Sequence, residues 1–258
     1  MGLVDAHCHF DFAEFDGRRD RILSDLQSRG IERLVIPGVR WAHWDRVADV
    51  ARAHKNIYYC LGIHPWYVDE HDDQALSQLR QRLEDQPEGC VALGECGLDR
   101  IHGELDRQQP WFEAQVELAR DLDWPLVIHS VRTHDEVLVT LKRVGPRAPV
   151  LVHGFSGSKE QASKLVDQGC YLGVGGVITH ERASKTRTAI AQMPLEALVL
   201  ETDAPDMPPA GVAKGDNSPV NLERVLAALC ELRTESEARI REALAANVRA
   251  LYRWTDEA

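Results

Sequence analysis

Two histidines separated by one residue lie near the N-terminus, in the segment VDAHCHF from Val4 to Phe10. Alternate residues of a β-strand face the same side, so His7 and His9 are expected to point one way and Cys8 the other. Neighbouring imidazoles can ligate a divalent cation through their ring nitrogens. The segment therefore predicts part of a metal site at the end of a first strand.

Further histidines and acids recur along the chain, each near the end of a short apolar run. Ionisable groups buried together are costly unless they are paired or bind a metal. Six ligands exceed the three protein ligands usual for one catalytic zinc, whereas two cations about 3.5–4 Å apart could share them. The six candidate metal ligands are His7, His9, Glu95, His129, His153 and Asp203.

A single histidine at a strand end is more often a hydrogen-bonded core residue than a ligand, so the prediction depends on the whole set. His64, in the segment GIHP, fits either a hydrogen-bond donor behind the ligands or a substrate contact. Cys8 and Cys96 stand beside candidate ligands in the sequence, but the alternation of a strand turns them toward the surrounding helices. We expect both to be buried structural thiols.

Eight short apolar runs bounded by turn residues predict eight strands, each followed by a stretch with helical periodicity. Each unit has room for one strand, one helix and two loops. Eight such units fit one closed parallel (β/α)8 TIM barrel better than an open doubly wound sheet. The expected strands begin at Leu3, Arg33, Ile57, Val91, Pro125, Ala148, Tyr171 and Glu196.

In such a barrel the chemistry lies at the C-terminal ends of the strands, which is where the six candidate ligands, His64 and Asp99 fall. The Pro- and Gly-rich stretch from Asp203 to Pro219 is predicted to be a long active-site loop. Two helices, at about 221–232 and 236–252, follow it. No linker or low-complexity segment divides the chain, so residues 1–258 are expected to form a single domain.

Composition narrows the possible classes of protein. With 44% hydrophobic and 28% charged residues, the chain is of ordinary globular composition. It has no run of about 18 apolar residues and no apolar signal sequence, which predicts a cytoplasmic protein without a membrane span. Its six scattered cysteines argue against a disulfide scaffold. A net charge of −11 argues against gripping long nucleic acids by phosphate neutralisation alone, but allows a local basic rim.

Basic and aromatic residues near the strand ends could contact a substrate. Surface lysine and arginine usually only solvate a helix, and an aromatic residue beside a strand often only packs, so these assignments compete with ordinary structural roles. The residues that could meet phosphates are Arg132, Lys159, Arg182 and Lys185, and those that could stack on bases are Trp66 and Phe155.

Taken in order, the motifs DAHCHF, GIHPW, ALGECGLD, VIHS, VHGFSGS and LETDAP resemble those of the TatD family of metal-dependent hydrolases, often described as TatD-type DNases, within the amidohydrolase-like barrels. The resemblance runs from VDAHCHF to ANVRALY near the C-terminus. His64, Pro65 and Trp66 point to the GIHPW-containing subgroup of uncharacterised homologues. The chain departs from a common family pattern at Cys96, where an Ile is usual, and in offering only Lys214 where the loop after the eighth strand often has an Arg.

The resemblance implies a role for each candidate ligand. His7 and His9 would bind one ion, Glu95 would bridge both, and His129 and His153 would bind the second. Glu95 and Asp203 would be the catalytic residues: Asp203 would ligate the first ion and take a proton from the attacking water.

The leading hypothesis is a divalent-metal-dependent deoxyribonuclease, a 3′-5′ exonuclease-type phosphodiesterase that acts on single-stranded or frayed DNA ends with metal-activated water. The alternative is an amidohydrolase-like esterase or deacylase acting on a small molecule or aminoacyl-tRNA, because the same ions would polarise a carbonyl. A non-catalytic binding protein is a third class, against which the apparently complete ligand set argues. Imidazoles favour Zn, Ni or Co, while the carboxylates also allow Mn and Mg.

Overall fold

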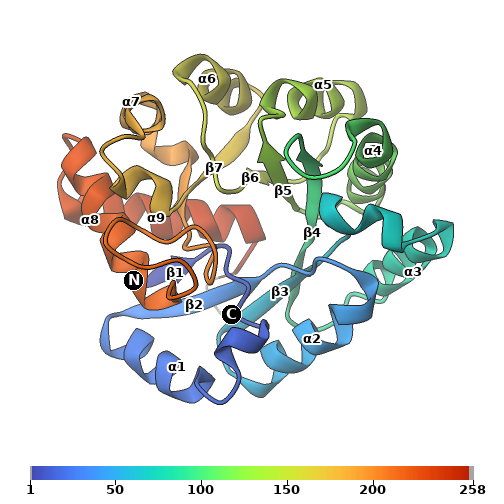
Figure 1. Cartoon of the computed structure of the whole chain (residues 1–258), viewed down its shortest axis with the longest axis horizontal. Coiled ribbons are helices and arrows are strands. Elements are labelled where there is room, and N and C mark those ends of the chain that lie inside the picture. The colour runs from blue at the N-terminus through green and yellow to red at the C-terminus, as the bar shows by residue number, and fades with distance from the viewer. Residues whose placement is uncertain (1, 256–258) are drawn as a thin grey trace.

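Eight parallel strands form a barrel in the computed structural model, which describes residues 2–255 (Figure 1). The strands follow one another around the sheet in chain order. The amide of Ala6 donates to the carbonyl of Leu200 over 2.9 Å, which joins the ends of the first and last strands and closes the ring. The strands are β1 (Leu3–Asp5), β2 (Ile31–Ile36), β3 (Ile57–Leu61), β4 (Cys90–Asp99), β5 (Leu126–Val131), β6 (Val150–Val152), β7 (Cys170–Val174) and β8 (Leu198–Leu200).

Helices follow the strands and surround them in chain order (Figure 1). Helix α6 begins with a capping box: Gln161 N donates to Ser158 Oγ, and Ser158 N donates to Gln161 Oε1. Within residues 2–255, none of the helices combines the length and the apolar character that crossing a bilayer requires. The α-helices are α1 (Arg19–Ser28), α2 (Trp44–Ala53), α3 (Asp73–Glu84), α4 (Leu105–Leu122), α5 (His134–Val144), α6 (Lys159–Asp167), α7 (Ser184–Gln192), α8 (Leu222–Leu232) and α9 (Glu237–Tyr252), and short 3₁₀ helices span Ala13–Phe15, Trp41–His43, Pro65–Glu70, Gly176–Thr179, Leu195–Ala197 and Pro219–Asn221.

Strand side chains alternate between two cores, because successive residues of a strand face opposite sides. In β2, for example, Leu34 and Ile36 pack in the layer between barrel and helices, whereas Val35 lies in a second cluster inside the barrel. This inner cluster contains Ala6, Val35, Cys60, Val91, Ala92, Val127, Leu151 and Val199, together with Val248, Leu251 and Tyr252 from α9.

Helix α9 covers one end of the barrel. The Tyr252 hydroxyl donates to the carbonyl of Ala6 over 2.7 Å, and the ring of Trp254 lies 4.7 Å from that of Tyr58, near the start of β3. These contacts place apolar side chains against the N-terminal ends of the strands, so water is excluded there. The accessible end of the barrel is therefore the one at which the strands finish.

An irregularity in β4 decides which way its polar residues face. Leu93 pairs with Leu126 and Cys96 pairs with Ile128, so three steps along β4 match two along β5, as in a β-bulge. Leu93 and Cys96 both pack in the helix-facing core. Without the extra residue, the alternation of the strand would place one of them inside the barrel. The bulge therefore turns Glu95 toward the interior.

Strand β1 is shorter than the sequence predicts. It ends at Asp5, so His7 and His9 follow the strand instead of belonging to it. Cys8 N nevertheless donates to Val35 O over 3.0 Å, which holds the segment alongside β2. Cys8 itself is fully buried in the helix-facing core, which confirms its prediction as a structural thiol.

Candidate metal centre

A cavity of about 500 Å³ opens at the C-terminal ends of the strands. Its floor consists of charged and imidazole side chains, most of them buried, although the surrounding barrel is apolar. The sequence-predicted ligands that line it are His9, Glu95, His129, His153 and Asp203, and His7 lies directly behind them.

Glu95 lies between two pairs of imidazoles. Its Oε2 atom is 3.2 Å from His7 Nε2 and 3.6 Å from His9 Nε2. Its Oε1 atom is 2.9 Å from His129 Nδ1 and 2.8 Å from His153 Nε2. One carboxylate is thus shared by groups from the N-terminal segment, β5 and the loop after β6.

Asp203 completes the first of these groups. Its Oδ1 atom lies 3.5 Å from Nε2 of both His7 and His9. The backbone of Asp203 is in the left-handed region with φ of 53°, and its amide donates to the carbonyl of His7 over 2.9 Å. This turn directs the carboxylate, which follows β8, toward the histidines that follow β1.

Several buried atoms of this cluster have no hydrogen-bond partner within residues 2–255. Leaving a buried polar group unpaired costs about 1–3 kcal/mol, and more if it is charged. A divalent cation would satisfy those that face the cluster, His7 Nε2, Glu95 Oε2 and Asp203 Oδ1. Imidazole nitrogens with carboxylate oxygens are a donor set that transition metals accept. The unpartnered atoms are His7 Nε2, His9 Nδ1, Glu95 Oε2, His153 Nδ1 and Asp203 Oδ1.

The candidate ligand atoms are also close enough to share an ion. Three overlapping groups each place their ligand atoms within 4.8 Å of one another. The groups are His7 with His9 and Glu95, His7 with His153 and Asp203, and His64 with Glu95 and His129.

The electrostatics keep both carboxylates ionised. Burial raises the pKa of Glu95, but the surrounding imidazoles, His153 foremost, outweigh it and hold that pKa well below its ordinary value. Burial likewise raises the pKa of Asp203, but the neighbouring imidazoles, His9 foremost, lower it by more. Burial and the neighbouring His153 lower the pKa of His7, which leaves its ring neutral. Burial also lowers the pKa values of His9, His129 and His153, but the carboxylates beside them outweigh it and raise these values above the ordinary one. A cation bound by the two carboxylates would displace the protons of these imidazoles.

Asp99 orients His129. Its Oδ2 atom accepts from His129 Nε2 over 3.0 Å and from Trp66 Nε1 over 2.7 Å. The other ring nitrogen, Nδ1, lies 2.9 Å from Glu95 Oε1 and faces the centre of the cluster, where a bound cation would replace its proton while Nε2 keeps its bond to Asp99. Carboxylate–histidine pairs of this kind fix the orientation of metal-binding imidazoles. Asp99 was expected at the rim without a role. Its position four residues after Glu95, on the same face of the strand, is the signal in the sequence that could have indicated one.

His64 has the opposite tautomer. Its Nδ1 atom accepts from the amide of Trp66 over 3.1 Å, so the ring proton lies on Nε2, which is 3.2 Å from Glu95 Oε1. A nitrogen that carries a proton donates a hydrogen bond and does not ligate a metal. Of its two expected roles, the geometry favours the donor that positions Glu95.

Asp5 links the first and last segments of the site, a role that the sequence analysis missed. Its carboxyl group accepts from Thr202 N over 2.9 Å and from Thr202 Oγ1 over 2.5 Å. Burial raises the pKa of Asp5 to about 8, against the hydrogen bonds from Thr202 and His7, which lower it. These bonds hold the segment that carries His7 against the one that carries Asp203.

The rim above the floor is largely apolar and partly aromatic. Trp66 is 47% exposed and Met207 43%, and both line the cavity with the more exposed Ile101. Lys214, from the predicted long loop, is the lysine that lines this cavity among the described residues. Of the expected substrate contacts, His64 and Trp66 therefore lie at the metal cavity.

The remaining expected contacts lie elsewhere. Arg132 lines a neighbouring cavity, and Lys159 is exposed on the first turn of α6 and lines neither of these two cavities. The expectation for Phe155 is wrong in this structure: its ring is 1% exposed and packs edge-on against His134 at 5.1 Å between centroids. A base cannot stack on a ring that the core already covers.

Comparison with known proteins places these features in a family. The sequence model described as TatD related DNase matches residues 4–253. The "Uncharacterized metal-dependent hydrolase YjjV" of Escherichia coli is 43% identical over 252 residues, which are 97% of this chain and 97% of that protein. The "3′-5′ ssDNA/RNA exonuclease TatD" of Pantoea ananatis is 28% identical over 262 residues, which cover 97% of this chain and 99% of that protein.

Solved structures agree with the fold. The crystal structure of the E. coli YjjV protein, a TatD homologue, superposes with a TM-score of 0.94 at 43% identity and covers 98% of both chains. A TatD-family hydrolase from Entamoeba histolytica shares the fold with a TM-score of 0.87 at 17% identity, over 98% of each chain. The (β/α)8 barrel predicted from the sequence is thereby confirmed.

Proposed function

Because the chain belongs to the TatD-related DNase family and is a metal-dependent hydrolase, we propose that it is a phosphodiesterase that removes nucleotides from the 3′ ends of single-stranded DNA. The observation that carries the proposal is the position of Glu95, whose two oxygens face two separate sets of imidazoles. A relative named as a 3′-5′ ssDNA/RNA exonuclease aligns over nearly the whole chain and supports the choice of substrate.

We propose two divalent cations at this centre. His7, His9 and Asp203 would hold one with Glu95 Oε2, and His129 and His153 would hold the other with Glu95 Oε1. When bound, such ions supply Lewis acidity, which polarises a phosphoryl group and lowers the pKa of a water molecule. The imidazole-rich donor set favours Zn, Ni or Co, and the carboxylates also admit Mn or Mg.

The side chains of the protein would supply orientation and proton transfer. Asp203 is held ionised beside His7 and His9, so its carboxylate can accept a proton from the attacking water and later return it to the leaving oxygen. Asp99 keeps His129 in one tautomer, and His64 donates to Glu95. These contacts hold the reacting groups in a fixed geometry.

The cavity suits the end of a single strand. Its volume of about 500 Å³ lies within the usual range for small ligands, roughly 300–1,000 Å³. The exposed ring of Trp66 offers a stacking surface for one base, and Lys214 offers a charge for a phosphate. The carboxylates and imidazoles lie below this rim. The end of an unpaired strand can reach them more readily than a base pair inside a duplex can.

Oligonucleotides labelled at the 5′ end test the proposal. We expect metal-loaded protein to shorten single-stranded DNA from the 3′ end, and Asp203→Asn to lower the rate by about a thousandfold or more because it removes both a ligand and the proton acceptor. Asp216→Asn, an exposed position in the same loop, is the matched control and should be fully active. No shortening above the Asp203→Asn background would overturn the proposal.

The apolar rim favours a second candidate, hydrolysis of an ester or amide with an apolar acyl group. Exposed Ile101 and Met207 would contact such a group. A panel of phosphodiesters, carboxylic esters and aminoacyl-tRNA separates the two. A kcat/KM for an acyl substrate above that for every phosphodiester would select the esterase or deacylase.

A further inference from the structure

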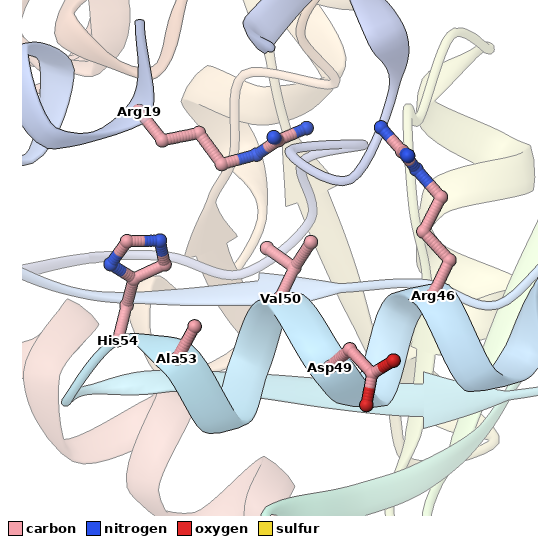
Figure 2. A pocket seen from close by; sticks show the side chains of 6 residues that line it. All are labelled: Arg19, Arg46, Asp49, Val50, Ala53 and His54. Atoms are coloured by element: carbon pink, nitrogen blue, oxygen red, sulfur yellow. The ribbon is translucent and has the colours of Figure 1, made fainter. Parts of the chain in front are cut away.

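Some basic side chains that line cavities of this protein are already engaged. Figure 2 shows one such pocket, where Arg19 and Arg46 approach each other over α2. Arg19 donates to Asp16 and to three main-chain carbonyls, and Arg46 donates to Asp16 and to the carbonyl of Asp11. Guanidinium groups bonded in this way have little capacity left for a ligand.

A second cavity beside the metal centre differs in this respect. It has a volume of about 440 Å³ and lies among the loops that follow β5, β6 and β7. Three cations line it: Arg132, Arg182 and Lys185. Within residues 2–255, the structure shows no hydrogen bond or ion pair to their side chains. We call it the basic pocket; its lining includes Arg132, His134, Gln161, Arg182 and Lys185.

None of the neighbouring carboxylates forms an ion pair with these cations within residues 2–255, although the charge of Lys185 reaches Glu160. Asp135, at the start of α5, pairs with Lys164 over 3.1 Å, and Glu136 pairs with Arg100. Three cations without an ion-pair partner in the described chain therefore gather at one cavity of a protein whose net charge is −11. Such a local field attracts anions, against the charge of the whole molecule.

His134 adds a buried donor to the basic pocket. It is 3% exposed, and its Nε2 atom has no hydrogen-bond partner within the described chain. Burial lowers the pKa of His134 to about 4, so the ring is neutral at physiological pH. An unpartnered ring nitrogen in the wall of a cavity indicates that a ligand supplies the missing bond.

The first turn of α7 faces the same cavity. Ser184, Lys185 and Thr186 line it, and Ala183 provides no side-chain cap. The amide groups of a first helical turn lack partners within the helix and favour negative charge. The helix terminus therefore reinforces the three cations and His134.

We propose that the basic pocket binds a phosphate of the same nucleic acid strand whose end enters the metal cavity. This inference rests on the proposed function. Val131 lines the metal cavity and Arg132, the next residue, lines the basic pocket, so one loop after β5 separates the two. A strand that leaves the metal cavity over this loop brings a backbone phosphate to Arg132, Arg182 and Lys185.

The dependence of KM on substrate length tests the proposal. We expect KM to be lower for thymidylate strands long enough to reach the basic pocket than for shorter ones, when strands of two to eight nucleotides are compared. Replacing Arg132, Arg182 and Lys185 together by Gln should raise KM for the octanucleotide about tenfold, with kcat unchanged and the dinucleotide unaffected. The matched control replaces exposed Arg18, Arg21 and Lys55, outside both cavities, by Gln and should leave KM within about twofold.

A binding measurement separates this proposal from the proposed function. Metal-free protein labelled with ¹⁵N-histidine is titrated with octathymidylate and followed by NMR. The Nε2 resonance of His134 is assigned by its absence in His134→Gln. Its chemical shift should change with octathymidylate concentration until binding is saturated. The shift should be lost in the single variant Lys185→Gln if the triple variant does not fold. Saturable binding without any hydrolysis would refute the nuclease and keep the pocket.

The opposite result would refute the pocket alone. Hydrolysis with a KM that does not depend on strand length, and that the triple variant leaves unchanged, overturns the proposal while the nuclease stands. A His134 shift caused by inorganic phosphate but not by octathymidylate would also overturn it, because the ligand would then be a small free anion.

Discussion

The two cavities at the mouth of the barrel differ in how the charged groups that line them are paired. The metal cavity has ionised Glu95 and Asp203 among imidazoles, whereas the basic pocket has Arg132, Arg182 and Lys185 without carboxylate partners. In the metal cavity, burial lowers the pKa of His9, but Asp203 and Glu95 outweigh it and raise that pKa to about 9, so imidazolium groups balance the carboxylates there. No carboxylate forms an ion pair with the three cations of the basic pocket within residues 2–255. A cation in the metal cavity would take the place of the protons on the imidazoles, and an anion in the basic pocket would neutralise its three cations.

The two sets also differ in burial, and this decides how strongly each needs its ligand. Glu95 is 1% exposed and Asp203 is 9% exposed, so water cannot replace a missing cation well. The three cations of the basic pocket are exposed and remain hydrated when no phosphate is present. We therefore expect changes in the metal cavity to have the larger effects.

The largest effect is expected for Glu95→Gln. The change removes the negative charge that both groups of imidazoles face, so metal content should fall below one ion per chain and hydrolysis by about a thousandfold or more. Metal analysis after gel filtration and the oligonucleotide assay measure these two losses. Glu117→Gln, exposed on α4, is the control.

Binding at the basic pocket should be unchanged in Glu95→Gln if the two cavities act separately. If octathymidylate binding were also lost, the two cavities would not act separately. Full metal content in this variant would show that Glu95 is not a ligand.

A smaller effect is expected for Asp99→Asn. Asp99 accepts from His129 Nε2, and an amide in its place loses the charge that holds the imidazole in one tautomer. Metal affinity should fall about 10- to 100-fold, as is usual when such a partner is removed. Competition with a chelator measures it, with exposed Asp106→Asn as the control. Unchanged affinity would place His129 outside the metal centre.

The smallest effect concerns His134 and the stability of the fold. Its pKa is about 4 in the folded protein and near its ordinary value of 6.5 when unfolded, so the unfolded chain binds the proton first. Stability is therefore full above pH 6.5 and is lost as the pH falls toward 4. Between pH 8 and pH 6 the free energy of unfolding should drop by about 1 kcal/mol more than in His134→Gln.

Urea unfolding at the two pH values measures this difference. Equal drops in both proteins would mean that His134 is protonated or hydrated in the folded state. The basic pocket would then lack its buried neutral donor.

Local patterns were enough to predict the barrel. Turn residues and apolar runs repeat eight times, and parallel strands that alternate with helices have few ways to bury both faces. The rule that chemistry lies at the strand ends then gathered the candidate ligands, and the structure does bring all six together. The family that the motifs resemble is confirmed by the match over residues 4–253.

Other features required the tertiary structure, because they depend on contacts between distant segments. The bulge that turns Glu95 inward shows only in the pairing of β4 with β5. The tautomers of His64 and His129 follow from Trp66 and Asp99, which no local pattern connects to them. Phe155 looked available for stacking because its sequence neighbours do not reveal that His134 packs against its ring.

The sequence by itself determined which kinds of residues meet at the rim, since strand order and strand direction set that. The tertiary structure decided which atom of each residue faces its neighbours, and which cations remain without a partner. The physical reason is the sequence separation over which each effect acts. Periodicity and turn chemistry depend on a few neighbouring residues, whereas hydrogen bonds, burial and charge pairing at this site depend on segments that are far apart in the chain.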